Sequence, residues 1–144
     1  MELLEFKNVY KNYGDKQILK DINLKVKEGK IISRAHNIKE EKNDTTKHAE
    51  IIAIQKASKK LNSWRLDDCD IYVTLEPCPM CAGAIINAHI PKVYFGAYDF
   101  KNGSCGSITN LFEMPYNFKP VCYGGLMQEE CSALLKDFFK KLRK

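Results

Sequence analysis

The pattern of hydrophobic and polar residues predicts strands near the start of the chain and alternating strands and helices after it. Along residues 22–27 every second residue is apolar, a period of two that is typical of a half-exposed strand. Glu28-Gly29 is a turn signal, and a second strand is expected to start with residues 30–33. Short runs of β-branched and aromatic residues predict further strands at 71–75, 93–98 and 119–123.

Three segments carry the period of a helix. The first runs from about residue 47 to 61, and its inner side is formed by Ile51, Ile52, Ala53, Ala57 and Leu61. The second spans about 79–88 and stops before Pro91. The third covers 128–142, and its apolar face is formed by Leu134, Leu135, Phe138, Phe139 and Leu142. Residues 67–70 read as an acidic loop. A long loop is expected over 99–117, with a helical turn near 108–112.

Strands and helices that alternate after residue 30 predict an α/β sandwich with a mixed or largely parallel sheet. A length of 144 residues suits one compact domain, and 44% hydrophobic with 28% charged residues argues against disorder. No apolar run reaches the roughly 18 residues that span a bilayer, and the first residues lack the features of a secretory signal. These observations predict a cytoplasmic protein without a membrane segment.

The net charge of +5 is unevenly distributed, because residues 132–144 hold five basic side chains and one acidic one. Such a tail would favour a polyanion such as RNA. It is equally consistent with a solvated helix end whose cations complement the helix dipole.

His48, Cys78 and Cys81 are the residues that suit a metal ion. One imidazole and two thiolates match tetrahedral zinc and leave a fourth position open for water. Glu50 follows His48 by two residues and is placed to move protons to and from that water. The combination is the His-x-Glu and Pro-Cys-x-x-Cys signature of zinc nucleobase deaminases. Because His48 and Cys78 both fall at expected helix starts, we expect two helix N-termini to converge on one ion.

The Cys78 and Cys81 pair has two other interpretations. A lone Cys-x-x-Cys also serves as a redox pair or as half of a structural zinc site, but no further Cys or His lies at the spacing that a structural site needs. The remaining cysteines have no special spacing, so burial in the core or in a loop is expected for Cys69, Cys105, Cys122 and Cys131.

The run Val-Thr-Leu-Glu-Pro-Cys-Pro-Met-Cys-Ala-Gly-Ala-Ile at residues 73–85 closely resembles the bacterial tRNA-specific adenosine deaminase family. The likeness covers about residues 29–144. It implies a three-layer α/β/α fold of the cytidine-deaminase type with a mixed five-stranded sheet. It also implies hydrolysis of adenosine to inosine at the wobble position of a tRNA anticodon, by a homodimer with one zinc ion per subunit.

The same resemblance implies roles for individual residues. His48, Cys78 and Cys81 correspond to the zinc ligands and Glu50 to the proton shuttle. The substrate contacts that it implies are Asn37, which would hydrogen-bond the flipped purine, Asp99, which would lie near the ribose, and Asn117. Phe118 follows Asn117 where the family often has His. Phe138 and Phe139 match the family's RNA-facing helix, and core packing is an equally good interpretation of both.

Residues 1–28 depart from this family, which normally opens with an amphipathic helix and a buried strand. Here a β-rich segment replaces that helix, and it resembles the start of an ABC-transporter ATPase. The phosphate-binding motif of such ATPases occurs nowhere in the chain, which excludes nucleotide hydrolysis by that route. We therefore predict an atypical segment at 1–28 and a deaminase domain at 29–144. In this arrangement residues 22–27 take the place of the missing strand and form a hairpin with residues 30–35.

Three functional hypotheses follow. The first is an RNA-editing adenosine deaminase, and the second is a deaminase of free bases or nucleosides such as cytosine or guanine. The third is a less stable, catalytically impaired chimera that only binds zinc or RNA, and it depends on the replaced N-terminus.

Overall fold

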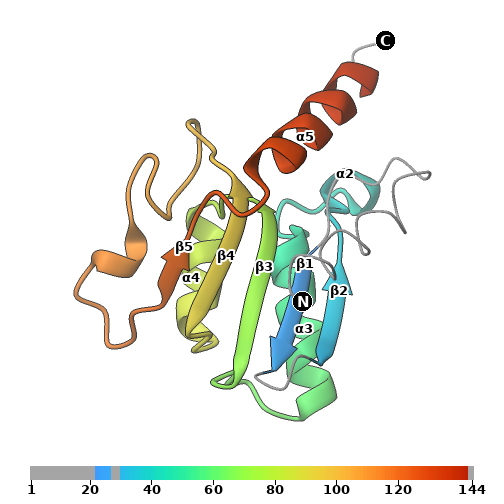
Figure 1. Ribbon diagram of the computed structural model, residues 1–144. Helices are drawn as coiled ribbons and strands as arrows, with labels where there is room; N and C mark the ends of the chain where they lie inside the picture. Colours follow the sequence, from blue (N-terminus) through green and yellow to red (C-terminus); the bar gives the residue numbers. More distant parts are fainter. Residues whose placement is uncertain (1–21, 27–29, 143–144) are drawn as a thin grey trace.

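The computed structural model describes residues 22–26 and 30–142, and in these the chain forms one mixed sheet in the strand order β2-β1-β3-β4-β5 (Figure 1). β1 (Ile22–Val26) runs antiparallel to both of its neighbours, β2 (Ile31–Ala35) and β3 (Cys69–Leu75). β3, β4 (Lys92–Ala97) and β5 (Val121–Tyr123) are mutually parallel. The predicted α/β fold is confirmed.

The strand predicted from the alternation in 22–27 occupies the predicted place, because β1 pairs with β2 on one side and with β3 on the other. The hairpin partner expected over residues 30–35 is present as β2, which ends at Ala35. One boundary was wrong, because β3 begins at Cys69, inside the expected acidic loop. The boundary placed after residue 28 and the ATPase-like residues 1–21 lie outside the described residues.

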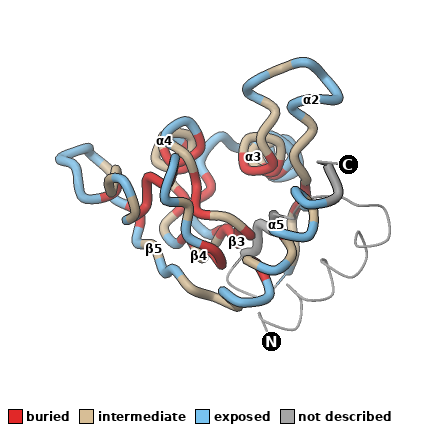
Figure 2. The backbone as a smooth tube through the Cα atoms, turned by 90° about the horizontal axis from the view of Figure 1, so that it is seen from above, coloured by how far each residue is buried: buried red, intermediate tan, exposed pale blue. Residues whose placement is uncertain are grey.

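The helices lie on both faces of the sheet and give the expected three layers. α3 (Ala49–Leu61) and α4 (Pro79–Asn87) cover one face, and α5 (Gln128–Leu142) crosses the other (Figure 2). The large core lies between the sheet and the first pair, around Ile71, Ile85 and Phe95. A smaller cluster under α5 consists of Tyr72, Ala97, Cys131 and Leu135.

In two helices, residues at the end of the predicted apolar face are exposed. In α3 the buried residues include Ala53 and Ala57, whereas Leu61 is 40% exposed in the last turn. In α5 Cys131 and Leu135 are buried, but Phe139 is 45% exposed, because the helix runs past the edge of the sheet (Figure 1). Periodicity identifies the face of a helix and not the length over which a neighbour covers it.

Two short helical segments complete the described elements. α2 (Lys39–Lys42) follows β2 and was not predicted, since it contains no apolar residue. The predicted helical turn is present as η1 (Leu111–Glu113), where the side-chain oxygen of Asn110 accepts a hydrogen bond from the Phe112 N–H.

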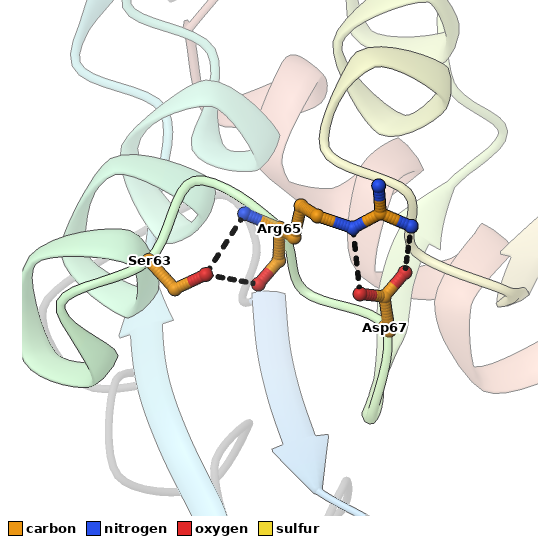
Figure 3. Close-up of polar contacts among 3 residues, drawn as sticks. All are labelled: Ser63, Arg65 and Asp67. Carbon is orange, nitrogen blue, oxygen red and sulfur yellow. Dashed lines mark hydrogen bonds and ion pairs between the residues drawn. The ribbon is translucent and has the colours of Figure 1, made fainter.

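The connection from α3 to β3 is closed by local polar contacts (Figure 3). The Ser63 hydroxyl accepts from the Arg65 N–H at 3.1 Å and donates to the Arg65 carbonyl at 3.0 Å. The Arg65 guanidinium donates to both carboxylate oxygens of Asp67, at 2.9 and 3.2 Å. Both side chains are about half exposed, so the pair shapes the turn more than it stabilises the fold.

All six cysteines are free thiols. As expected, Cys69, Cys105 and Cys131 are buried and Cys122 is partly buried. Burial raises the pKa of Cys69 to about 11, so its thiol is inert at neutral pH. Within the described residues, no helix combines the length and the apolar character that crossing a membrane requires.

The space around two glycines predicts opposite effects on stability when each is replaced by alanine. A Cβ at Gly96 would overlap the Cys131 sulfur and lie 2.9 Å from the Leu126 carbonyl oxygen, whereas a Cβ at Gly83 meets nothing within 4 Å. We expect Gly96→Ala to destabilise the protein by about 1–3 kcal/mol. We expect Gly83→Ala, inside α4, to stabilise it by about 0.4–1 kcal/mol. Chemical denaturation of both variants measures the two shifts, and a neutral Gly96→Ala would contradict this packing.

Candidate metal centre and adjoining cavity

The three predicted ligands are brought together at the N-termini of two helices. His48 is the N-cap of α3, Cys78 is the N-cap of α4, and Cys81 lies in the first turn of α4. The Sγ atoms of Cys78 and Cys81 lie 3.7 and 3.6 Å from His48 Nδ1, and the ligand atoms of all three residues lie within 4.8 Å of one another. The predicted convergence of two helix starts is confirmed.

The local sequence explains why α4 begins where it does. Pro79 occupies the first helical position, where its missing N–H costs nothing and its fixed φ suits a helix. Cys78 is therefore extended, and its carbonyl accepts the first helical hydrogen bond, from the Ala82 N–H at 2.9 Å. Its side chain then projects beside the unpaired N–H groups and the positive end of the helix dipole, which favour a thiolate.

The two thiols differ in their readiness to ionise. A hydrogen bond from the Cys81 thiol lowers the pKa of Cys78 to about 6, although burial opposes this shift. The same hydrogen bond, together with burial, raises the pKa of Cys81. Cys78 therefore ionises more readily than Cys81, and a cation at the centre would hold both sulfurs as thiolates.

Glu50 lies in the first turn of α3, only 3% exposed, and its Oε2 makes no hydrogen bond to any described residue. A buried carboxylate oxygen without a partner is costly unless a ligand or a nearby cation compensates it. The site therefore fits a zinc ion on two tests: soft sulfur and nitrogen donors converge, and one carboxylate oxygen beside them is left without a partner.

The centre opens into a cavity of about 970 Å³. Asn37 and Asp99 line it together with His48, Glu50 and Cys78. The structure does not bring Asn117 there: this residue is exposed, and it is not among the lining residues. Its substrate contact remains a prediction.

The side chains of Asn37 and Asp99 are both held by backbone N–H groups. Asn37 Oδ1 accepts from the Lys39 N–H at 2.8 Å, at the start of α2. This leaves the Asn37 amide NH2 as the group that can donate to a ligand. Asp99 Oδ1 accepts from the N–H groups of Lys101 and Asn102, at 3.0 and 3.1 Å.

Sequence reasoning missed several residues of the cavity. Those not predicted as site residues are Lys39, Thr45, Leu75, Glu76, Pro79, Met80, Tyr98, Phe100, Lys101, Asn102 and Leu135; Phe139 was weighed as an RNA-facing residue. A usable signal existed for Tyr98 and Phe100, because two aromatic residues flank Asp99 at the start of a long loop. Nothing in the sequence pairs Glu76 with the residues that it bonds.

Glu76 fastens the loop that carries Asp99. Its carboxylate is 2% exposed and accepts from the N–H groups of Asp99, Cys105 and Ser107, at 3.1, 3.0 and 3.0 Å, and from the Ser107 hydroxyl. The Ser104 N–H adds a bond to the Pro77 carbonyl at 2.9 Å. Residues 99–107 are therefore tied to the segment that leads directly to Cys78.

Comparisons with known proteins agree with this geometry. The chain matches the MafB19-like deaminases over residues 5–143. It is 46% identical to the tRNA-specific adenosine deaminase of Bacillus subtilis over 81% of this chain and 73% of that protein. It is 48% identical to the protein of the same name from Aquifex aeolicus, over 82% of this chain and 78% of the other.

Solved structures extend the comparison. One, from a study of A-to-I editing by tRNA:A34 deaminases at the wobble position of transfer RNA, superposes with a TM-score of 0.81 and 37% identity, covering 93% of this chain and 99% of the other. A guanine deaminase from Nitrosomonas europaea superposes with a TM-score of 0.78 over 94% of this chain and 81% of the other. Its identity is 18%, so this second likeness concerns the fold.

The ligand geometry predicts which substitutions remove zinc. Cys78→Ser replaces a soft sulfur by a hydroxyl, so we expect the purified variant to hold well under half of the wild-type zinc content, which should be about one ion per chain. Glu50→Ala removes no ligand and should retain the metal. Elemental analysis of the two variants beside the wild type measures this, and equal zinc in Cys78→Ser would contradict the ligand assignment.

The Glu76 contacts predict a local opening of the loop. In Glu76→Gln an NH2 group replaces one acceptor oxygen, so at least one loop donor is left buried and unpaired, at a cost of about 1–3 kcal/mol. Hydrogen exchange at the amides of Asp99, Cys105 and Ser107 should accelerate. Ser107→Ala leaves both carboxylate oxygens in place and serves as the milder control. Unchanged exchange at all three amides in Glu76→Gln would show that the loop does not depend on Glu76.

Proposed function

The chain belongs to the MafB19-like deaminase family and to its tRNA-specific adenosine deaminases, and from this we propose that it hydrolyses adenosine to inosine at the wobble position of a tRNA anticodon. One observation of the structure supports this proposal most directly. The Glu50 carboxylate, whose Oε2 makes no hydrogen bond to a described residue, lines the same cavity as His48, Cys78, Asn37 and Asp99. The third ligand side chain, Cys81, completes the cluster beside it. Proton transfer, metal binding and base recognition thus share one space.

We propose that His48, Cys78 and Cys81 hold the zinc ion. When bound there, zinc lowers the pKa of water at its open position toward neutrality. Glu50 takes up a proton from the attacking water, and its buried position keeps bulk water from competing. It then delivers protons to the purine ring nitrogen and to the departing amine. One water is consumed, and inosine and ammonia are the products.

Recognition of the base falls to the wall of the cavity. The Asn37 amide NH2 is free to donate to a purine acceptor, because its oxygen is already held by the Lys39 N–H. Asp99 sits at the start of the loop fastened by Glu76, which suits a contact to the ribose hydroxyls. A purine must leave its stack to reach Glu50, so the substrate is single-stranded there.

An anticodon stem-loop is the proposed partner, and a homodimer in the cytoplasm is the proposed assembly. Positive charge supports the RNA assignment: Lys39 and Lys101 line the cavity, and residues 132–144 are strongly basic. The alternative, a deaminase of free bases, has the likeness to solved guanine deaminases in its favour, and their identities to this chain are lower than those of the tRNA deaminases. The impaired chimera remains a hypothesis about residues 1–28. The pairing of β1 with both neighbours shows that one strand of this segment completes the sheet.

The decisive experiment measures inosine in an anticodon stem-loop with adenosine at the wobble position. We expect turnover by the zinc-loaded wild type and a loss of roughly 100- to 10,000-fold in kcat in Glu50→Ala, because general acid–base catalysis contributes about that much. Zinc content and RNA binding of the variant should be retained. Deamination of free guanine or cytidine with the stem-loop untouched would favour the alternative. If neither the wild type nor Glu50→Ala forms inosine while both still bind the RNA, the impaired chimera is favoured.

A further inference from the structure

Phe100 is the most exposed of the large hydrophobic side chains in the described residues, at 78%, and it lines the cavity. Tyr98 lines the same cavity at 37% exposure, and the two aromatic residues flank Asp99. An exposed phenyl ring costs free energy in the unliganded protein because water must surround it. Its position at a substrate cavity therefore points to a ligand that covers it.

The Phe100 ring is supported by a series of aromatic contacts that begins at a residue in the core. Phe95 is buried in β4 and meets the Tyr98 ring edge to face, with centroids 5.1 Å apart and planes at 88°. The Tyr98 ring lies nearly parallel to that of Phe100, with centroids 6.4 Å apart and planes at 18°. Gly124 leaves room for this arrangement, since a Cβ there would lie 2.7 Å from the Tyr98 hydroxyl.

The backbone that carries Phe100 is also fixed. The Asp99 N–H is held by Glu76, and the Asp99 carboxylate accepts from the N–H groups of Lys101 and Asn102 on the other side of Phe100. A preorganised apolar ring loses little conformational entropy when a ligand stacks on it. Lys101 lines the cavity beside it and supplies a positive charge.

The substrate chemistry identifies what would cover this ring. Once an adenine enters the cavity, the bases next to it lose a stacking partner. Proteins that bind unstacked bases place them on aromatic side chains and neutralise the adjoining phosphates with cations. We propose that Phe100, backed by Tyr98, is the stacking platform for the base of a nucleotide next to the target adenosine, with Lys101 beside its phosphate. This inference rests on the proposed function and extends it from the target base to its neighbour.

The test is equilibrium binding of stem-loop RNA to the zinc-loaded Glu50→Ala protein, whose slow turnover leaves the substrate intact during the measurement. Three RNAs are compared: the intact loop, a loop abasic at the nucleotide 5′ of the target, and a loop abasic 3′ of it. Base stacking on an aromatic ring is worth about 1–3 kcal/mol, and a rim position suggests the lower end, a change in Kd of about 5- to 10-fold. We expect Phe100→Ala and one of the abasic loops each to weaken binding by that factor.

The coupling between the two changes decides the matter. If the base that the abasic loop lacks is the one that stacks on Phe100, its removal should cost nothing once Phe100 is gone. The abasic and intact loops should then bind Phe100→Ala with the same Kd. Phe100→Tyr should restore wild-type binding, while Phe100→Leu, apolar without an aromatic face, should not. Ile108→Ala is the matched control, because Ile108 is 62% exposed in the same loop segment and does not line the cavity.

Other outcomes overturn the proposal in distinguishable ways. Removal of the base 5′ or 3′ of the target could raise the Kd by the same factor in Phe100→Ala as in the protein that keeps Phe100. Such a result for both positions would show that no adjacent base stacks on Phe100. A shift of the oligomeric state in Phe100→Ala with unchanged Kd would assign the ring to a protein interface. A protein that holds zinc and binds no stem-loop would contradict the proposed function and the platform together. Inosine formation by the wild type with a KM unaffected by Phe100→Ala would contradict the platform alone.

Discussion

The carboxylate of Glu76 must be fully hydrogen-bonded, because it is buried where water cannot solvate its charge. Donors at Asp99, Cys105 and Ser107 meet this requirement, so the loop has to wrap around the end of β3. The consequence reaches the site: the wrapped loop carries one wall of the cavity, and Cys78 follows Glu76 by two residues. One buried carboxylate therefore sets the position of this cavity wall relative to the candidate metal centre.

Strand direction explains why these parts meet at one edge. β3 and β4 are parallel, so the segment with Glu76 and Cys78 and the segment with Tyr98 and Asp99 leave the sheet on the same side. α3 and α4 both begin there, which brings two positive helix ends to the thiols and to His48. Gly103 permits the close wrapping, because a Cβ there would collide with the Glu76 carboxylate. The centre is thus a consequence of topology as much as of its ligands.

Local patterns predicted what depends on local chemistry. The alternation in 22–27 located β1 to the residue at its start, the 3.6-residue period located α5, and Pro79 marked the start of α4. Patterns failed where neighbours decide the outcome. Phe139 and Leu61 are exposed because the sheet and the packing end before the helices do. Glu76 went unrecognised because its partners lie 23 to 31 residues further along the chain, a separation that leaves no periodic signal.

Two buried carboxylates line this cavity, and their hydrogen bonding separates their roles. Glu76 is saturated with donors, which leaves it no lone pair for a substrate. Glu50 keeps Oε2 unpaired at similar burial, and such an arrangement is stable only where positive charge or a ligand proton offsets it. The helix N-termini and the three ligands supply the site for that charge. The saturated carboxylate of Glu76 therefore suits a structural role, and the free oxygen of Glu50 suits the proton transfer that the proposed function assigns to it.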